Sequence, residues 1–366
     1  MADIEADPME HSIFPGIDEM LAPKVLSILA EQPVTSVRCL PLQASYAQSG
    51  SRLLAVETND GQGPRCILKR ISPADWLMRA TEDRLCRSVM LWQHGILDRM
   101  PPEIEHGILA CALDGQGWAI LMRDVSAALV PYSPFSVADN ECFLDAMAAL
   151  HATFFESPEL TDPALGLCTL RHVYTMFSPL TGYREAGGPD QIPQRILEGW
   201  DLVQTLVEPD VASALLELVD DPQPLCDALS SYPQTLIHGD WRHANQGLLR
   251  RENTQTVMLD WQLAAIAPPS VELGRYLGTN SVLLPVSKEM AIACYRQRLA
   301  DRLGRRFNTD WWQPQLELGL LGGFVQDGWA IALKATHWHV GAGARDHWRD
   351  DLRWWSEQVR AGVRWL

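Results

Sequence analysis

The chain divides into two parts by the spacing of its hydrophobic positions. Between Val34 and Asp124, apolar residues recur with the two-residue period of strands in the runs VTSVRCLPL, SRLLAVET, PRCILKRI, GILACAL and WAILMRDV. The short sequences NDGQG and DGQG join two pairs of these runs and are typical of hairpin turns. This part of the chain therefore predicts a small antiparallel sheet.

One segment within this part has helical spacing instead. Over residues 73–97, Trp76, Leu85, Val89 and Trp92 recur near the period of a helix. We expect a single helix here, crossing the sheet.

Helical periodicity dominates after Asp124. In ADNECFLDAMAALHATFF, Phe143, Met147 and Leu150 fall on one face, and Asp139 is the expected N-cap. Helices continue around residues 191–220 and 287–303 and from 311 to the end, whereas 234–263 has the pattern of two or three short strands joined by polar turns.

The strand-rich first part and the helix-rich second part predict an α+β fold with two lobes around a cleft. Residues 1–124 would form the smaller lobe, a small N-terminal antiparallel sheet plus one helix, with an acidic N-terminal extension over 1–20. Residues 125–366 would form the larger, mainly helical C-terminal lobe. No linker rich in Gly, Ser or Pro separates the lobes, which favours one unit.

Composition narrows the class of protein. The 366 residues are 47% hydrophobic and 21% charged, and no run approaches the roughly 18 consecutive apolar residues of a membrane span. The net charge of −16 argues against a nucleic-acid partner, because phosphate backbones need clustered positive charge, and it would help attract a cationic small substrate. The acidic N-terminus lacks the pattern of a secretion signal, so we expect a cytoplasmic protein. The oligomeric state stays open.

The densest polar cluster lies between two apolar runs, in LIHGDWRHANQGLL. It contains Asp240 and Asn245 with the spacing H-x-D-x-x-x-x-N, and VMLDWQ places Asp260 after the next strand-like run. A carboxylate that begins a tight loop can take a proton from a hydroxyl, while an amide oxygen and a second carboxylate are hard ligands that Mg²⁺ prefers. The pattern is that of phosphoryl-transfer enzymes, with Asp240 as candidate catalytic base and Asn245 and Asp260 as candidate metal ligands.

Two other interpretations of this cluster are open. Gly, Asp and Asn are common turn residues, so the loop by itself could be a polar turn between strands; its agreement with Asp260 and an upstream Lys69 favours the catalytic interpretation. His238, Asp240 and His243 could instead bind a hydrolytic zinc or iron, although no clear remaining ligand set accompanies them. The eight cysteines are scattered singly, which is typical of small buried hydrophobes.

The chain resembles the aminoglycoside phosphotransferase and choline kinase family of small-molecule phosphotransferases. LIHGDWRHANQGLL is similar to that family's catalytic loop, MLDWQLAAIAPPSVELGRYL to its metal-binding strand and the segment after it, and MAALHATFF to a preceding helix. The likeness extends from about Val34 onward and is strongest over 237–277. It implies a two-lobed, protein-kinase-like fold, ATP with Mg²⁺ as cofactors, and transfer to a hydroxyl of a small molecule.

The resemblance also implies roles for single residues. Asp240 resembles the catalytic base, Asn245 and Asp260 resemble the magnesium ligands, and Lys69 in CILK resembles the lysine that holds the α and β phosphates of ATP. Glu272 resembles a position where relatives often have aspartate, and we expect it to brace the catalytic loop.

The sequence departs from the family pattern near the nucleotide. The turn that should cover the phosphates has only Ser49, Gly50 and Ser51, whose backbone amides we expect to contact phosphate. The acidic partner expected for Lys69 is Glu82, because Ser88 stands where the pattern has glutamate.

The acceptor is not fixed by the sequence. The last 60 residues or so are rich in tryptophan, which predicts core packing more strongly than an aromatic and acidic cage for an amine. The proposed activity is ATP- and Mg-dependent phosphorylation of a small, possibly cationic, hydroxylated molecule. A catalytically silent kinase-like binding protein is the alternative, because the glycine-poor turn and the missing helix glutamate weaken the pattern.

Overall fold

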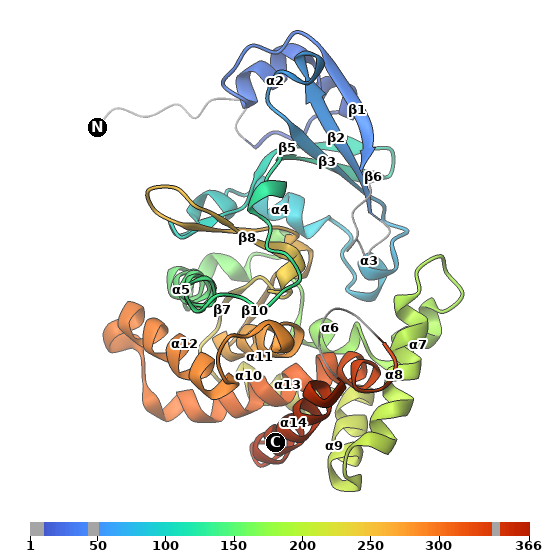
Figure 1. Cartoon of the computed structure of the whole chain (residues 1–366), viewed down its shortest axis with the longest axis vertical. Helices are drawn as coiled ribbons and strands as arrows, with labels where there is room; N and C mark the ends of the chain where they lie inside the picture. Colours follow the sequence, from blue (N-terminus) through green and yellow to red (C-terminus); the bar gives the residue numbers. More distant parts are fainter. Residues whose placement is uncertain (1–10, 43–50, 339–344) are drawn as a thin grey trace.

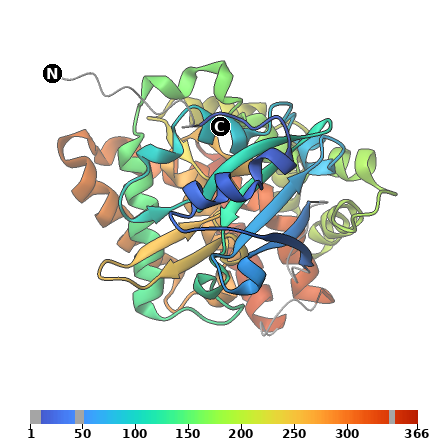
Figure 2. The same cartoon turned by 90° about the horizontal axis from the view of Figure 1, so that it is seen from above.

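The computed structural model describes residues 11–42, 51–338 and 345–366. Figure 1 shows a sheet lobe, drawn in blue and cyan, above a larger helical lobe that contains the C-terminus. Seen from above in Figure 2, the sheet strands lie in front of the helical lobe. The predicted α+β fold is confirmed, with an antiparallel sheet in the N-terminal part and a mainly helical C-terminal part.

The sheet of the N-terminal lobe has five antiparallel strands in the order β1-β2-β3-β6-β5. The two predicted hairpins join β2 to β3 and β5 to β6. Two short helices precede the sheet, and Phe14 donates its backbone N–H to Cys111 on β5. The bounds are α1 (Ile17–Met20), α2 (Pro23–Leu29), β1 (Val37–Leu42), β2 (Arg52–Thr58), β3 (Cys66–Ile71), β5 (Ile108–Asp114) and β6 (Gly117–Arg123).

The single helix expected over residues 73–97 is wrong. The segment forms two short helices, α3 (Trp76–Ala80) and α4 (Arg87–Gln93), separated by an irregular turn. Glu82 and Cys86 in this turn have φ values of 49° and 58°, which a helix does not allow. The break turns the Asp83 carboxylate toward the first turn of α4, where it accepts the Arg87 backbone N–H at 2.9 Å.

Arg87 anchors α4 to the helical lobe. Its side chain is only 2% exposed, and its guanidinium donates to the carbonyl oxygens of Gly166, at 2.6 Å, and of Gln262. Helix α4 is therefore fixed to the helical lobe by hydrogen bonds rather than by apolar contact alone.

Short strands interrupt the helical lobe where the sequence predicted them. A three-stranded sheet has the order β4-β9-β8, and β4, which lies between α4 and β5 in the chain, pairs in parallel with β9. A second small sheet pairs β7 with β10. The bounds are β4 (Ile104–Glu105), β7 (Thr235–Ile237), β8 (Gln246–Leu249), β9 (Gln255–Met258) and β10 (Ala265–Ala267).

Most of the remaining elements are helices; α8, α11 and α14 pack most closely on the long, buried α13, whereas α5 and α12 pack against each other. The predicted helix after Asp124 is α5, but its N-cap is Ser136, whose hydroxyl accepts from the Asp139 backbone N–H, rather than Asp139 itself. Ser136 takes this place because it has the extended backbone of an N-cap one residue before the first turn. The bounds are α5 (Val137–Thr153), α6 (Leu170–Thr175), α7 (Pro179–Glu185), α8 (Ile192–Leu206), α9 (Pro209–Asp220), α10 (Gln223–Ser230), α11 (Pro269–Thr279), α12 (Lys288–Leu303), α13 (Thr309–Thr336) and α14 (Arg345–Val363).

Glycines let α11 and α13 cross at very short range. A Cβ added to Gly274 would lie 2.4 Å from the Gly319 carbonyl oxygen, and one added to Gly323 would lie 2.9 Å from Gly274. Any side chain at these positions would push the helices apart. The close crossing brings Arg275, the next residue on α11, toward the inner face of α13.

No helix within residues 11–42, 51–338 and 345–366 is long and apolar enough to cross a bilayer.

Candidate active site

The catalytic-type loop begins where β7 ends and is fixed through its backbone. Glu272 on α11, which is fully buried, accepts the His238 N–H at 2.5 Å and the Gly239 N–H at 2.8 Å. The predicted bracing role of Glu272 is thereby confirmed. Gly239 has φ 81°, and a Cβ there would lie 2.1 Å from the Leu263 carbonyl oxygen, so only glycine fits.

His238 anchors the start of the loop from a buried position. Its ring is fully buried, its Nδ1 accepts the Asp240 backbone N–H at 3.2 Å, and its Nε2 lies 2.9 Å from the Leu259 carbonyl oxygen. Both ring nitrogens are thus used within the protein. The ring ties the start of the loop to the residue that precedes Asp260.

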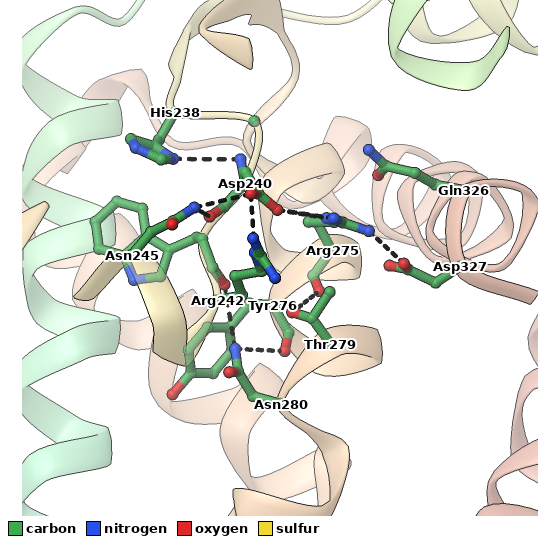
Figure 3. Close-up of polar contacts among 12 residues, drawn as sticks. His238, Asp240, Arg242, Asn245, Arg275, Tyr276, Thr279, Asn280, Gln326 and Asp327 are labelled. Atoms are coloured by element: carbon green, nitrogen blue, oxygen red, sulfur yellow. Dashed lines mark hydrogen bonds and ion pairs between the residues drawn. The ribbon is translucent and has the colours of Figure 1, made fainter. Parts of the chain in front are cut away.

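The Asp240 carboxylate accepts hydrogen bonds from three side chains (Figure 3). Its Oδ1 accepts from Arg275 at 2.7 Å, and its Oδ2 accepts from Arg242 at 3.0 Å and from Asn245 Nδ2 at 2.8 Å. Burial disfavours the charged form, but the guanidinium groups of Arg242 and Arg275 outweigh it and hold the pKa of Asp240 well below its ordinary value. The carboxylate is therefore ionised throughout the physiological range of pH.

The β8–β9 hairpin brings Asn245 beside the second aspartate. Gln246 pairs with Met258 across the hairpin, and the Leu259 N–H donates to the Asn245 carbonyl oxygen at 2.8 Å. The Asn245 Nδ2 also donates to the Asp240 carbonyl oxygen at 3.0 Å, so the amide nitrogen points to Asp240 and Oδ1 points away from it. Residues separated in the sequence thus meet at one end of the hairpin.

Lys69 reaches this end of the hairpin from the other lobe. Its Nζ lies 2.8 Å from Asp260 Oδ1, and the lysine is only 8% exposed. Asp260 has a left-handed backbone, with φ 67° and ψ 64°, which is sparsely populated by residues other than glycine and asparagine. The four residues predicted from the sequence as the centre of the site, Lys69, Asp240, Asn245 and Asp260, are brought together.

The predicted pairing of Lys69 with Glu82 is wrong. The Glu82 side chain is 60% exposed and lies 3.8 Å from Arg84 and 3.9 Å from His172, while Lys69 pairs with Asp260. The left-handed turn between α3 and α4 directs Glu82 to solvent. Asp75, the N-cap of α3, is a buried acid near Lys69 that the sequence analysis missed; its burial raises its pKa, and the charge of Lys69 opposes this.

The predicted phosphate-covering turn falls largely outside the described part of the chain. Ser49 and Gly50 are not among the described residues, and Ser51 immediately precedes β2. The role of all three stays a prediction.

Arg275 is the central residue of the site that the sequence analysis missed. It is 6% exposed and lies between two carboxylates, with one side of its guanidinium on Asp240 and Nη1 on Asp327 of α13 (Figure 3). Burial of the Asp327 carboxyl raises its pKa, and Arg275 opposes this. A signal was present, because Asp327 is a lone acid in the long apolar stretch GLLGGFVQDGWAIAL and an unpaired charge there would be costly.

The zinc or iron interpretation finds no support in the described residues. Nowhere in 11–42, 51–338 and 345–366 do three or more His, Cys, Asp or Glu side chains form a group that could hold a metal. The His243 ring packs edge-on against Tyr132, with ring centroids 4.7 Å apart, and burial together with the charges of Arg242 and Lys334 lowers its pKa to about 4.

Most of the C-terminal tryptophans pack in or against the core, and cations of the protein itself contact the rings of three of them. Trp312, Trp329, Trp348 and Trp355 are buried. Other contacts place Arg195 4.6 Å from the ring centroid of Trp338, Lys334 4.4 Å from that of Trp348 and Lys288 5.1 Å from that of Trp354. An amine ligand would compete with these cations for the ring faces.

Comparison with known proteins assigns the chain to a family. The sequence model of the phosphotransferase enzyme family matches residues 47–311, which is more than half of the chain and includes all four central residues of the site. The chain belongs to the phosphotransferase enzyme family. The predicted relationship is thereby confirmed.

Three solved structures are similar to this phosphotransferase over most of its length. An ethanolamine kinase of Plasmodium vivax has 12% identity and a TM-score of 0.47, over 88% of this chain and 82% of the other. A choline kinase of Streptococcus pneumoniae has 14% identity and a TM-score of 0.45, over 94% and 99%. An aminoglycoside phosphotransferase of Streptomyces rimosus, in complex with ADP and streptomycin, has 16% identity and a TM-score of 0.44, over 84% and 98%. Comparison with curated protein sequences gave no match.

Proposed function

We propose that this chain transfers the γ-phosphoryl group of ATP to a hydroxyl group of a small molecule in a Mg²⁺-dependent reaction. The acceptor oxygen forms a bond to the γ-phosphorus as the bond from phosphorus to the bridging oxygen of ADP breaks, and the hydroxyl proton leaves to Asp240. One observation carries the proposal: Lys69 of the sheet lobe contacts Asp260 at 2.8 Å, beside the hairpin end where Asn245 holds Asp240.

Asp240 would act chiefly as an oriented acceptor and a fixed negative charge. Its low pKa makes it a weak base, but three side-chain donors fix its position. A hydroxyl that donates to this carboxylate would be aligned for attack, and in a loose transition state orientation contributes more than full proton abstraction. Lys69 would hold the phosphates of ATP, and the pairing with Asp260 keeps its ammonium group in place before the nucleotide binds.

The residues at the hairpin end fit a magnesium ion. Asp260 offers a carboxylate with 30% of its side chain exposed, and Asn245 offers Oδ1, because its Nδ2 is committed to Asp240. Both are hard oxygen donors of the kind that Mg²⁺ prefers, and the phosphates of ATP would supply others. When bound, the ion would neutralise charge on the phosphates.

The decisive experiment compares the intact protein with Asp240→Asn in a metabolite-pool screen with γ-labelled ATP. We expect a labelled product with the intact protein, a loss of about 100-fold or more in Asp240→Asn, and retention of the thermal shift caused by MgATP. Asp201→Asn, an exposed aspartate on α8, is the matched control and should transfer label normally. Undiminished transfer by Asp240→Asn would refute the role of Asp240.

The catalytically silent alternative has a specific observation in its favour, since Arg242 and Arg275 already occupy the Asp240 carboxylate. It predicts a MgATP-dependent thermal shift without transfer to any pool component.

The cytoplasm is the compartment we propose, because it supplies ATP and keeps thiols reduced, and all eight cysteines are free.

A further inference from the structure

Helix α3 connects the sheet lobe to the helical lobe beside α7 (Figure 1). The Trp76 indole N–H donates to Asp190 Oδ2 at 2.8 Å, and the other oxygen of Asp190 accepts the Ile192 backbone N–H at the start of α8. The Arg79 guanidinium donates to the buried carboxylate of Glu185 on α7, with Nε at 3.1 Å. Helix α3, the first helix after β3, is therefore attached to two helices of the far lobe.

A chain of side-chain contacts leads from Trp76 to Asp240. The ring centroids of Trp76 and Phe177 are 6.2 Å apart, and Phe177 lies between α6 and α7. The guanidinium carbon of Arg275 lies 5.4 Å from the centroid of the Phe177 ring. Arg275 in turn donates to Asp240 Oδ1 from Nη2 at 2.7 Å and from Nε at 3.2 Å. Three contacts thus connect α3 to the candidate catalytic residue.

Phe177 gives the Arg275 guanidinium an aromatic neighbour besides its two carboxylates. A cation above an aromatic ring is attracted to it, so the ring helps to fix where the guanidinium lies. Phe177 is itself held, because its carbonyl oxygen accepts Trp200 Nε1 at 2.7 Å and its ring lies 5.6 Å from that of Trp329. Trp76 contacts the same ring from α3. A shift of Trp76 would therefore change how Phe177 packs against Arg275.

Helix α3 also follows the strand that carries Lys69. Asp75, in the short connection after β3, is the N-cap of α3 and accepts the Leu77 backbone N–H at 3.2 Å. The helix thus has one end beside the strand of the lysine that would hold ATP and contacts the chain of residues that ends at Asp240. A misplacement of reacting groups by about 1 Å can slow a reaction about 100-fold, so the relative position of these two groups matters.

We propose that Trp76 is a positioning residue for the Asp240 carboxylate. It acts through Phe177 and Arg275 and sets the place of this carboxylate relative to Lys69. The inference rests on the proposed function and adds to it a contact between the lobes on which turnover depends. If Trp76 only packed in the core, its loss would lower stability without a selective loss of turnover.

The test compares variants that remove single rings of this contact chain. Trp76→Leu and Phe177→Leu each remove one ring, whereas Trp76→Phe keeps a ring against Phe177 and loses the donor to Asp190. The matched control is Trp92→Leu on α4, because Trp92 is as buried as Trp76, at 6% against 7% exposed, and its ring contacts His11 instead.

The first readout is the initial rate of label transfer from γ-labelled ATP to the metabolite pool, measured over a range of ATP concentrations. We expect Trp76→Leu and Phe177→Leu to lower the maximal rate about tenfold or more and to change the KM for ATP less than about threefold. Trp76→Phe should recover most of the rate lost in Trp76→Leu. Trp92→Leu should lose a similar amount of melting temperature and keep its maximal rate within about twofold.

The second readout does not depend on activity. In protein with isotope-labelled arginine, the NMR signal of the Arg275 Nε–H, assigned by its loss in Arg275→Lys, reports the nearby Phe177 ring. We expect this signal to move in Trp76→Leu and Phe177→Leu and to stay in place in Trp92→Leu. If Trp76→Leu does not fold, Phe177→Leu decides by the same two readouts, since the proposal acts through that ring.

The outcomes separate the positioning role from the proposed function. A rate loss in Trp76→Leu no larger than that in Trp92→Leu, a rise in the KM for ATP that accounts for the loss, or an unmoved Arg275 signal would overturn the positioning role alone. If the intact protein transfers no label to any pool component, the proposed function fails, and the positioning role fails with it.

Discussion

The buried carboxylate of Glu272 allows a sharp test of how the catalytic loop is held. Its two oxygens accept two backbone N–H groups, from His238 at 2.5 Å and from Gly239 at 2.8 Å. In Glu272→Gln only one oxygen remains, and the new NH₂ group faces an N–H donor. A hydrogen bond to a charged group contributes about 1.5–3 kcal/mol, and a buried donor left without a partner costs about as much again.

The expected destabilisation of Glu272→Gln is therefore about 3–6 kcal/mol. With an unfolding entropy of about 2.1 cal/mol/K per residue, a chain of this length should lose roughly 4–8 °C in melting temperature. A shift of the loop should also reduce turnover by about tenfold or more, because Asp240 is positioned by the same backbone.

Calorimetry of the intact protein, Glu272→Gln, Glu272→Asp and Glu217→Gln measures this effect. Glu272→Asp keeps both acceptor oxygens on a shorter side chain and should lose less stability than Glu272→Gln. Glu217→Gln changes an exposed carboxylate on α9 and should leave the melting temperature unchanged. If Glu272→Gln melted within a degree of the intact protein, the two hydrogen bonds would not be what holds the loop.

Three further predictions concern the charges of the site. Arg275→Met removes one ion-pair partner of Asp240 and, among the described residues, the ion-pair partner of Asp327. Urea denaturation should therefore show a loss of about 3–5 kcal/mol, and a loss below about 1 kcal/mol would contradict the buried bridge. Lys69→Met removes the contact with Asp260 and should raise the KM for ATP at least tenfold with little change in melting temperature; unchanged steady-state kinetics would refute its role. Lys334 keeps its proton up to about pH 10.5 in the unfolded chain but only up to about pH 8 in the folded chain. The free energy of unfolding of the intact protein should therefore rise as the pH increases between these two values. The free energy of unfolding of Lys334→Gln should thus exceed that of the intact protein by about 2–3 kcal/mol at pH 7. This difference should become smaller from pH 8 to 10. A constant difference across this range would exclude the lowered pKa of Lys334.

The sheet lobe and the catalytic loop could be read from the sequence because local signals determine them. A strand with one buried face repeats every second residue, and the hairpin turns require small or flexible residues such as those of NDGQG. The loop residues are recognisable because metal and phosphate chemistry needs particular side chains at a fixed spacing, as Asp240 and Asn245 show.

The hydrophobic periodicity gave a wrong prediction where the backbone conformation changes within the predicted helix. The apolar spacing over 73–97 is helical on both sides of the turn at Glu82 and Cys86, so periodicity gave one helix where the structure has two. A left-handed residue that is not glycine leaves no mark in the pattern. The error then carried over to Glu82, which the continuous helix would have turned inward.

By itself, the sequence determined that this protein has a sheet lobe followed by a helical lobe, and it singled out Lys69, Asp240, Asn245 and Asp260, which the fold brings together. The tertiary structure alone decided that Lys69 pairs with Asp260, that Arg275 bridges Asp240 and Asp327, and that Lys334 packs on the Trp348 ring. Such contacts join residues far apart in the chain. The Arg275 bridge depends on how closely α11 and α13 pack through Gly274 and Gly319, and no local propensity encodes that distance.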